Sequence, residues 1–485
     1  MKYMVDPKQI GMFDPELGHF GFRNLARLQN GWQGIFRRSL LAAMPAEELA
    51  EDFSPDKGRP TKELYSMAGL VLIAEMNCWT SEEASSAYAF DQSLQYALNV
   101  GHVGVELSSR SVERFQRIFR EKELAQTVFE RVTSILTEEL QLVVDMQRLD
   151  STHLFSDMAR FGRTRLLATC INRFLVQLKR HHNGEYAALP ELLRERCRTP
   201  GHKVFGMRSP KGEDRAQLRL ELAQDMLALI DRFAGHAQIP QMTSYKAMVR
   251  VFSEQCEVTG GQIAIRKKTG GRTMQNPSDP DATYDGHKGK GYQVQLAETC
   301  HPDNPVQLIT CAMPQTAADE DGNALPEVVA WLEDAGMKPA ELLADTLYGS
   351  DANEQLCQAK GIDLVAPVRG KPPQAGFFPQ TDAQRRLFHR RIEEQTATWL
   401  DIYRRRAGIE GTNSGLKRRV ELGRLRVRGR KSVFNVTLLK ITGWNVFRAV
   451  DGLSRIAKKV AKAAKGMQER DLFANQSEIG VLNAA

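Results

Sequence analysis

A dense cluster of basic side chains surrounds a glutamate in the C-terminal part of the chain. The segment from Tyr403 to Lys431 carries eleven lysines and arginines but only two acids, Glu410 and Glu421. This segment alone is therefore more positive than the whole 485-residue chain, whose net charge is +7. Positive charge concentrated in one place is typical of a surface that binds a polyanion. The pattern favours nucleic-acid chemistry, and a solvated basic helix is the alternative.

The spacing around Glu410 sharpens this interpretation. Tyr403 and Arg406 lie seven and four residues before Glu410, and Lys417 lies seven residues after it. In a continuous α-helix, which turns by about 100° per residue, these side chains share one face with Asn413. A carboxylate flanked by a phenol, a guanidinium and an ammonium can hold a cation and clamp phosphates beside it.

Two glycines, Gly408 and Gly411, flank this glutamate. Each would cost the interior of a helix roughly 1 kcal/mol relative to alanine. Their presence suggests that another part of the chain approaches the backbone closely here.

Composition excludes several other classes of protein. The seven cysteines are dispersed and form no Cys-x-x-Cys pair, so we expect neither a zinc finger nor a disulfide framework. A reducing, cytoplasmic compartment fits this usage. The longest apolar stretch, near Ala68–Ala74, is too short to cross a bilayer, and we expect no membrane partner. The length predicts two to four domains.

The N-terminal part reads as helical. Residues 1–60 form a helical extension, and residues 61–135 contain three expected helices. The first spans Leu64–Met76, the second is capped by Thr80 or Ser81, and the third follows Ser108 or Ser109. The third helix carries four arginines, among them Arg114, and the set resembles a helix-turn-helix DNA-binding unit. An ordinary helical bundle with a charged face is the alternative.

Strand signals begin at about residue 142. We expect strands at Leu142–Thr152, Tyr292–Ala297, Val306–Met313, Glu341–Asp345 and Ile362–Val368, and helices at Leu325–Ala335 and Asn353–Lys360. This order is that of a ribonuclease-H-like mixed sheet within an α/β (α+β mixed) fold. The catalytic domain would span residues 136–450, with a largely helical insertion at about 156–290. Residues 451–485 would form a basic and then disordered tail.

Two acids fall at informative places in this order. Asp150 is expected at the end of the first strand, and Asp345 closes a later one. Carboxylates at the ends of neighbouring strands can converge, and Glu410 could join them from a helix packed across the sheet. Three such acids repel one another unless cations lie between them. Oxygen ligands of this kind suit two Mg²⁺ or Mn²⁺ ions.

The three acidic blocks resemble those of bacterial insertion-sequence DDE transposases. The blocks are Asp150-Ser151-Thr152, the run from Ala344 to Gly349 with Asn353 following, and Tyr403-x2-Arg406-x3-Glu410-x6-Lys417. The last block matches the tyrosine–arginine–glutamate–lysine pattern of that superfamily at every position. The segment of about 60–120 is similar to the helical domain that precedes the catalytic domain in many of these enzymes.

The resemblance implies a DNA transposase that binds the inverted ends of its own element, cuts strands by two-metal hydrolysis and joins 3′-hydroxyl ends to target DNA. Its metal-binding, catalytic triad would be Asp150, Asp345 and Glu410. Its DNA contacts would come from Tyr403, Arg406, Lys417, Arg418, Arg419 and Arg114. Its partner would be double-stranded DNA, bound by a homodimer. A nuclease of the same fold without strand transfer, or a catalytically inactive DNA-binding protein, is the alternative.

Several nearby residues compete for these roles. Asp279, Asp281 and Asp285 are better explained by turns. Asp319, Glu320 and Asp321 are candidates to cap the following helix, and Glu421 lacks the matched spacing. His153 is either a packed histidine or a partner of Asp150. The arginines and lysines of the insertion, including Arg160, Arg163, Arg165, Arg173, Lys179 and Arg180, could line the path of DNA.

Overall fold

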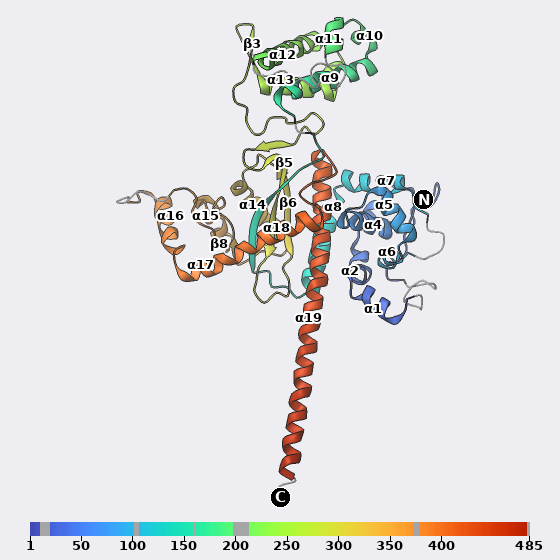
Figure 1. Cartoon of the computed structure of the whole chain (residues 1–485), viewed down its shortest axis with the longest axis vertical. Helices are drawn as coiled ribbons and strands as arrows, with labels where there is room; N and C mark the ends of the chain where they lie inside the picture. The colour runs from blue at the N-terminus through green and yellow to red at the C-terminus, as the bar shows by residue number, and fades with distance from the viewer. Residues whose placement is uncertain (10–19, 101–105, 160, 197–212, 372–377, 483–485) are drawn as a thin grey trace.

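The computed structural model of this chain describes residues 1–9, 20–100, 106–159, 161–196, 213–371 and 378–482. In the described residues before residue 140, the regular elements are all helices (Figure 1). The elements are α1 (Phe22–Gln29), α2 (Trp32–Ile35), the π-helical turn η2 (Phe36–Leu40), the 3₁₀ turn η3 (Leu41–Ala43), α3 (Ala46–Ala50), α4 (Leu64–Met76), α5 (Ser81–Phe90), α6 (Gln92–Ala97), α7 (Ser109–Glu121) and α8 (Leu124–Glu139).

Local sequence signals fix the starts of these helices. Helix α4 has the predicted bounds, and Glu63 caps it by accepting two backbone N–H groups. At α5, Thr80 forms a capping box with Glu83, in which each side chain accepts from the other residue's backbone N–H. The predicted second helix is divided in two, because Asp91 ends α5 and caps α6. Ser108 caps α7, and it is one of the two serines predicted for this position.

A six-stranded mixed sheet follows. Its strands are β1 (Met146–Leu154), β4 (Thr283–Asp285), β5 (Gly289–Thr299), β6 (Ile309–Thr316), β7 (Glu341–Leu343) and β8 (Asp363–Val365). The strand order is β4–β5–β1–β7–β8, with β6 also paired to β5. Strands β5 and β6 form the predicted antiparallel hairpin, and β1, β7 and β8 are mutually parallel. The five predicted strands are therefore all present, with bounds that differ by a few residues.

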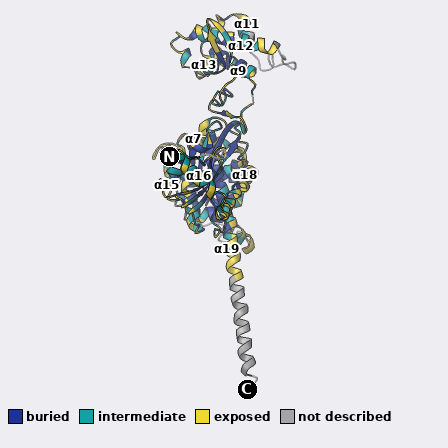
Figure 2. Cartoon of the chain, turned by 90° about the vertical axis from the view of Figure 1, so that its left-hand side faces the viewer, coloured by how far each residue is buried: buried dark blue, intermediate teal, exposed yellow. Residues whose placement is uncertain are grey.

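Hydrophobic side chains cover both faces of the sheet. On one face, α14 (Leu325–Asp334) and α15 (Asp351–Ala359) pack over a cluster that includes Leu149 and Ala297. On the other face, Leu154 and Leu296 belong to a larger cluster shared with the N-terminal helices and with α19 (Arg430–Leu482). Figure 2 shows buried residues gathered in this central body. The N-terminal helices and the sheet thus have one continuous core.

The insertion between β1 and β5 has a separate core. It contains α9 (Arg163–His181), α10 (Asn183–Ala187), α11 (Glu191–Arg196), α12 (Glu213–Phe233), the 3₁₀ turn η4 (Ile239–Gln241), α13 (Thr243–Gln255) and the hairpin β2 (Cys256–Thr259) and β3 (Gln262–Ile265). Its buried side chains, such as Phe174 and Phe233, form their own hydrophobic cluster. The insertion lies beyond one end of the sheet, as both views show (Figures 1 and 2). The predicted helical insertion is therefore present.

The basic segment is not one continuous helix, and the prediction that it would be was wrong. It consists of α17 (Ala397–Tyr403), the 3₁₀ turn η6 (Arg404–Ala407) and α18 (Gly408–Arg419), and it follows α16 (Asp382–Glu393). The carbonyl of Arg405 accepts a hydrogen bond of 3.0 Å from Arg148 Nη1 instead of serving an α-helical ladder. The tighter turn rotates Tyr403 relative to Glu410. The side chains of Tyr403, Arg406, Glu410 and Lys417 therefore do not follow a single α-helical face.

Helix α19 continues through the central body and projects well beyond it (Figure 1). It reaches Leu482, in a region where the sequence suggests a disordered tail. Within the described part of the chain, no helix combines the length and apolarity needed to cross a membrane.

Candidate catalytic site

Strand register places the first two acids of the predicted triad side by side. Strand β1 pairs in parallel with β7, with Arg148 opposite Leu343. The same register carried two residues further sets Asp150 level with Asp345. Asp150 lies inside β1 rather than at its end, which corrects the prediction, because β1 continues to Leu154 after β7 has stopped. The end of β7 thus opens the edge of β1 beside Asp150.

Burial and neighbouring charge affect Asp150 strongly. The pKa of its carboxyl is raised from 3.8 to about 6, first because the group is buried. The negative charges of Asp345 and Asp321 raise the pKa further, while Arg406 opposes the shift. A raised carboxyl pKa beside like charges is characteristic of functional sites.

Helix α18 packs against the same face of the sheet. Asn413 Nδ2 donates a hydrogen bond of 3.1 Å to Asp150 Oδ2. Arg406 Nη2 lies 3.7 Å from Asp150 Oδ1, and Arg406 Nη1 lies 3.5 Å from Glu410 Oε1. Arg406 therefore bridges the two acids. Glu410 itself is exposed, with 69% of its side chain accessible.

A buried ion pair fixes α18 to the sheet. Arg148 on β1 contacts Glu298 on β5 at 2.5 Å, and both side chains are largely buried. Glu298 also accepts a hydrogen bond of 2.7 Å from Thr412 Oγ1 on α18. A Cβ atom on Gly408 would lie 1.9 Å from Arg148 Nη1, so a glycine is required for this close approach. The close approach predicted at both glycines is present at Gly408 but not at Gly411, where a Cβ would have no neighbour within 4 Å.

The arrangement offers oxygen ligands but no complete metal centre. Within the described ranges, no three histidine, cysteine or acidic side chains form a group that could hold a metal ion. Two buried polar atoms of the site, Arg406 Nε and Asn413 Oδ1, have no hydrogen-bond partner in the described part of the chain. Carboxylate oxygens of Asp150 and Asp345 beside an unpaired amide oxygen are the donors that a hard cation prefers.

The remaining predicted DNA contacts lie at different places. Tyr403 stacks on Trp399 with ring centroids 4.7 Å apart. Burial raises the pKa of the Tyr403 phenol, and the charges of Asp345 and Asp150 add to the shift, so its ring lies near the acids. Arg418 and Arg419 are exposed on α18, and Arg419 lies over the Phe447 ring at 4.2 Å.

The DNA contact predicted in the N-terminal helices is Arg114. It belongs to α7, and its guanidinium lies over the Phe53 ring at 4.7 Å.

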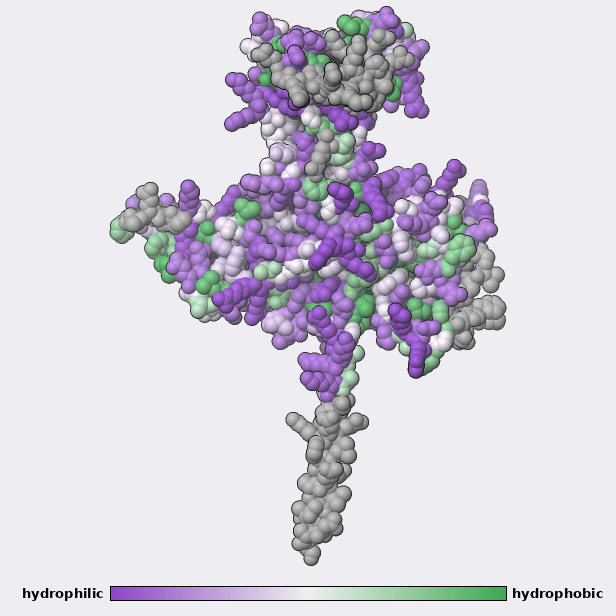
Figure 3. All heavy atoms as spheres, in the orientation of Figure 1, coloured by the Kyte–Doolittle hydropathy of each residue, from purple (hydrophilic) through white to green (hydrophobic). Residues whose placement is uncertain are grey.

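A groove at the end of β1 carries several positive charges. It has a volume of about 1000 Å³, and its lining consists of His153, Phe155, Asp157, Lys288, Lys417, Glu421, Gly423, Arg424, Leu425 and Arg426. Hydrophilic side chains cover much of the molecular face that includes α18 (Figure 3). Four of the lining residues are lysines or arginines, so the groove suits a phosphate backbone.

His153 is a packed histidine at the wall of this groove. Only 8% of the residue is exposed, its ring packs edge-on against Phe155 at 4.5 Å, and Nε2 lies 3.2 Å from the Lys290 carbonyl. Burial lowers its pKa, so its neutral form is favoured. The alternative of a packed histidine, rather than a partner of Asp150, fits these contacts.

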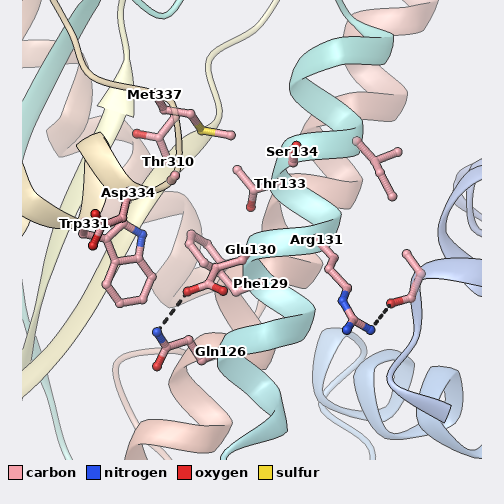
Figure 4. Close-up of a pocket in the computed structure, with 13 residues that line it drawn as sticks. Gln126, Phe129, Glu130, Arg131, Thr133, Ser134, Thr310, Trp331, Asp334 and Met337 are labelled. Carbon is pink, nitrogen blue, oxygen red and sulfur yellow. Dashed lines mark hydrogen bonds between the residues drawn. The ribbon is translucent and has the colours of Figure 1, made fainter. Parts of the chain in front are cut away.

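A second pocket, of about 570 Å³, lies between α8 and α14 (Figure 4). Phe129 and Trp331 face each other there, and Gln126 hydrogen-bonds Glu130 on the rim. None of the three predicted acids lines either this pocket or the basic groove. The groove, however, is lined by His153 on β1 and by Lys288, which bonds Ser151 next to Asp150. We therefore place the candidate chemistry at the part of β1 that borders the groove.

Sequence reasoning did not assign Asp321 or Lys288 to the site. Asp321 was one of three candidates, with Asp319 and Glu320, to cap the helix after the hairpin. Its carboxylate is instead buried and bonded to Ser151, Gln295 and Lys288. The glycine-rich run around Lys288 was the available signal, since it predicts a tight turn that can carry a lysine towards the sheet.

The basic residues of the insertion are mostly engaged locally. Arg163 donates to Gln255, and Arg173 donates to Ser278. Arg165 and Lys179 lie over aromatic rings of the insertion. Arg160 lies outside the described residues.

Comparison with known proteins gives one family match. Residues 266–446 match a family model described as "Transposase DDE domain", which includes Asp345 and Glu410 but not Asp150. The matched stretch is less than half of the chain. No curated protein and no solved structure matches the chain. The family match supports a DDE transposase, and hence an enzyme that processes DNA.

Proposed function

We propose that this chain is an insertion-sequence DNA transposase that binds the inverted ends of its own element, cuts them and joins the 3′-hydroxyl ends to target DNA. The observation that carries the proposal is the pair of acids at the edge of β1, set level by strand register, within reach of α18. The strands pair in the order β6–β5–β1–β7–β8. Of these five strands, β5 alone runs antiparallel to the others, and this arrangement supports a ribonuclease-H-like catalytic domain.

The three acids would hold two Mg²⁺ or Mn²⁺ ions. Asp150 and Asp345 already lie together, and Glu410 would complete the set from α18 when it leaves Arg406. When bound, such ions activate a water or a 3′-hydroxyl and stabilise the leaving oxygen of an in-line displacement. Arg406, once released from the acids, would be free to contact a DNA phosphate.

DNA would lie along the groove beside the acids. Lys417 and Arg424 reach this groove from α18 and from the segment after it, and Arg418 and Arg419 extend the basic surface along α18. Arg114 would contribute from α7 in the helical N-terminal part. A homodimer on DNA would pair two element ends, as the family resemblance implies.

The test is strand cleavage of the DNA that flanks the gene, with Mg²⁺ and with Mn²⁺. Wild type is expected to nick at defined ends, and Glu410→Gln is expected to bind the same DNA without cutting. Asp401→Asn is the matched control, because Asp401 is an exposed acid that pairs with Arg404 at 3.9 Å. Equal cutting by wild type and Glu410→Gln would reject the assignment of Glu410.

Two other functions give different results in the same assay. A nuclease of this fold would cut the ends but would not join them to a plasmid target. A DNA-binding protein without catalysis would bind the ends and leave them intact in every metal. Joining of 3′ ends to the plasmid therefore separates the transposase from both.

A further inference from the structure

A buried carboxylate lies behind the candidate acids and takes no part in the predicted triad. Asp321 is 6% exposed and begins the 3₁₀ turn η5 (Asp321–Ala324), which leads into α14. Its Oδ2 accepts hydrogen bonds from Ser151 Oγ at 2.8 Å and from Lys288 Nζ at 2.9 Å. Its Oδ1 accepts from Gln295 Nε2 at 3.0 Å. Each carboxylate oxygen therefore has a partner, as a buried charge requires.

Lys288 supplies the compensating charge. Its ammonium group bonds Ser151 Oγ at 2.7 Å and Gln293 Oε1 at 3.0 Å, in addition to Asp321. The residue lies in the tight connection between β4 and β5, and it also lines the basic groove. The Lys288–Asp321 pair is thus anchored to β1 and β5 at three points.

These contacts reach the strand position next to the first acid. Adjacent residues of a strand point to opposite faces of the sheet, so Ser151 faces away from Asp150. Asn413 on α18 holds Asp150 from one face, while Asp321 and Lys288 hold Ser151 from the other. The backbone of β1 is therefore fixed from both sides at the point where β7 no longer pairs with it.

The same carboxylate is connected to the second acid. Gln295, which pairs with Ser151 across β1 and β5, accepts a hydrogen bond from the Tyr348 hydroxyl. Tyr348 lies in the turn that follows Asp345, and its backbone N–H donates to the Asp345 carbonyl at 3.1 Å.

The backbone of η5 also touches this turn. A Cβ on Gly322 would lie 2.3 Å from the Leu347 carbonyl oxygen, and Asn353 Nδ2 bonds the carbonyls of both Gly322 and Tyr348. The turn that presents Asp345 is thus held by the same element that carries Asp321.

We propose that Asp321 and Lys288 form a positioning pair that sets the separation and orientation of Asp150 and Asp345 for metal binding. This inference rests on the proposed function, in which those two acids are metal ligands. Asp321 itself stays off the metal, because its oxygens are already occupied by Ser151, Gln295 and Lys288. Partners one step removed from metal ligands commonly contribute about 10–100-fold to metal affinity or activity.

The decisive measurement is the affinity of the full chain for Mn²⁺ in the absence of DNA. Titration calorimetry would compare this affinity in wild type, Asp321→Asn and Ser151→Ala. Asp321→Asn is expected to weaken Mn²⁺ binding and to slow end cleavage, each by about 10–100-fold, with an unchanged affinity for end DNA. Ser151→Ala keeps both charges and removes the two hydrogen bonds, one to Asp321 and one to Lys288, that tie the pair to β1, so a loss of about tenfold is expected. Glu320→Gln is the matched control, because this neighbouring acid is exposed and pairs with Arg369.

The outcomes separate the inference from the proposed function. If wild type binds Mn²⁺ and cuts DNA while both variants match it within about threefold, the positioning role is rejected alone. An equal loss in Glu320→Gln would also reject it, since the effect would then be one of general charge. If Asp321→Asn does not fold, Ser151→Ala decides by the same criterion. A wild-type chain that neither binds Mn²⁺ nor cuts DNA would reject the proposed function and this inference together.

Discussion

Replacing Asp150 by asparagine should stabilise the chain at neutral pH while removing a proposed metal ligand. The folded structure raises the pKa of this carboxyl from 3.8 to about 6, mainly through burial. The folded chain therefore retains a proton that the unfolded chain has already released between these two pH values. Since the unfolded state binds fewer protons there, stability falls as pH rises through that window.

The size of the effect follows from the shift. One pKa unit corresponds to about 1.36 kcal/mol, so the ionised carboxylate costs the folded state up to about 3 kcal/mol above pH 6. Roughly half of this cost develops between pH 5 and pH 8, and the other half is already present at pH 5. Asparagine does not ionise and carries none of it. Arg406 loses one partner in the variant but keeps Glu410 at 3.5 Å.

The assay is denaturant unfolding of wild type and Asp150→Asn at pH 5 and pH 8, with a chelator present. The advantage of the variant should grow by roughly 1–1.5 kcal/mol from the lower to the higher pH. Comparing the two proteins at each pH cancels the titration of groups that do not interact with Asp150. The reasoning would be refuted if the difference in unfolding free energy between variant and wild type were the same at both pH values. It would also be refuted if this difference moved in favour of wild type from pH 5 to pH 8. Asp401→Asn, which removes an exposed carboxylate, is the control variant.

Three further predictions concern the basic segment and its attachment to the sheet. Gly408→Ala should destabilise the chain by roughly 1–3 kcal/mol, because its Cβ would displace the buried Arg148. Gly411→Ala should instead stabilise the chain by roughly 0.4–1 kcal/mol. Thermal unfolding compares the two variants directly, and equal effects would contradict the geometry. Arg148→Met should cost about 3–5 kcal/mol, since it leaves Glu298 buried without its ion-pair partner, and urea unfolding would measure this. Lys417→Gln should reduce the salt dependence of end-DNA binding by about one phosphate contact, a slope change of about 0.9, and an unchanged slope would place Lys417 off the DNA.

Much of the fold could be predicted because its signals are local. Helix α4 has the predicted bounds, and the caps at Thr80 and Ser108 depend on residues within three positions in the sequence. The strands were recognisable from short apolar runs, although their ends differ from the prediction. Where the prediction failed, a distant contact was responsible: the 3₁₀ turn after Tyr403 forms where the Arg405 carbonyl bonds Arg148, which is 257 residues away in the chain.

The sequence by itself determined the types and spacing of the candidate acids, the concentration of basic charge around Glu410, and the order of strands and helices. Only the tertiary structure decided how these parts meet. Register along β1 and β7 sets Asp150 level with Asp345, and the Arg148–Glu298 pair docks α18 beside them. Asp321 illustrates the difference most clearly, because nothing in its local sequence distinguishes a helix cap from a buried carboxylate. Its role depends on partners contributed by strands far away in the chain, and only folding brings them together.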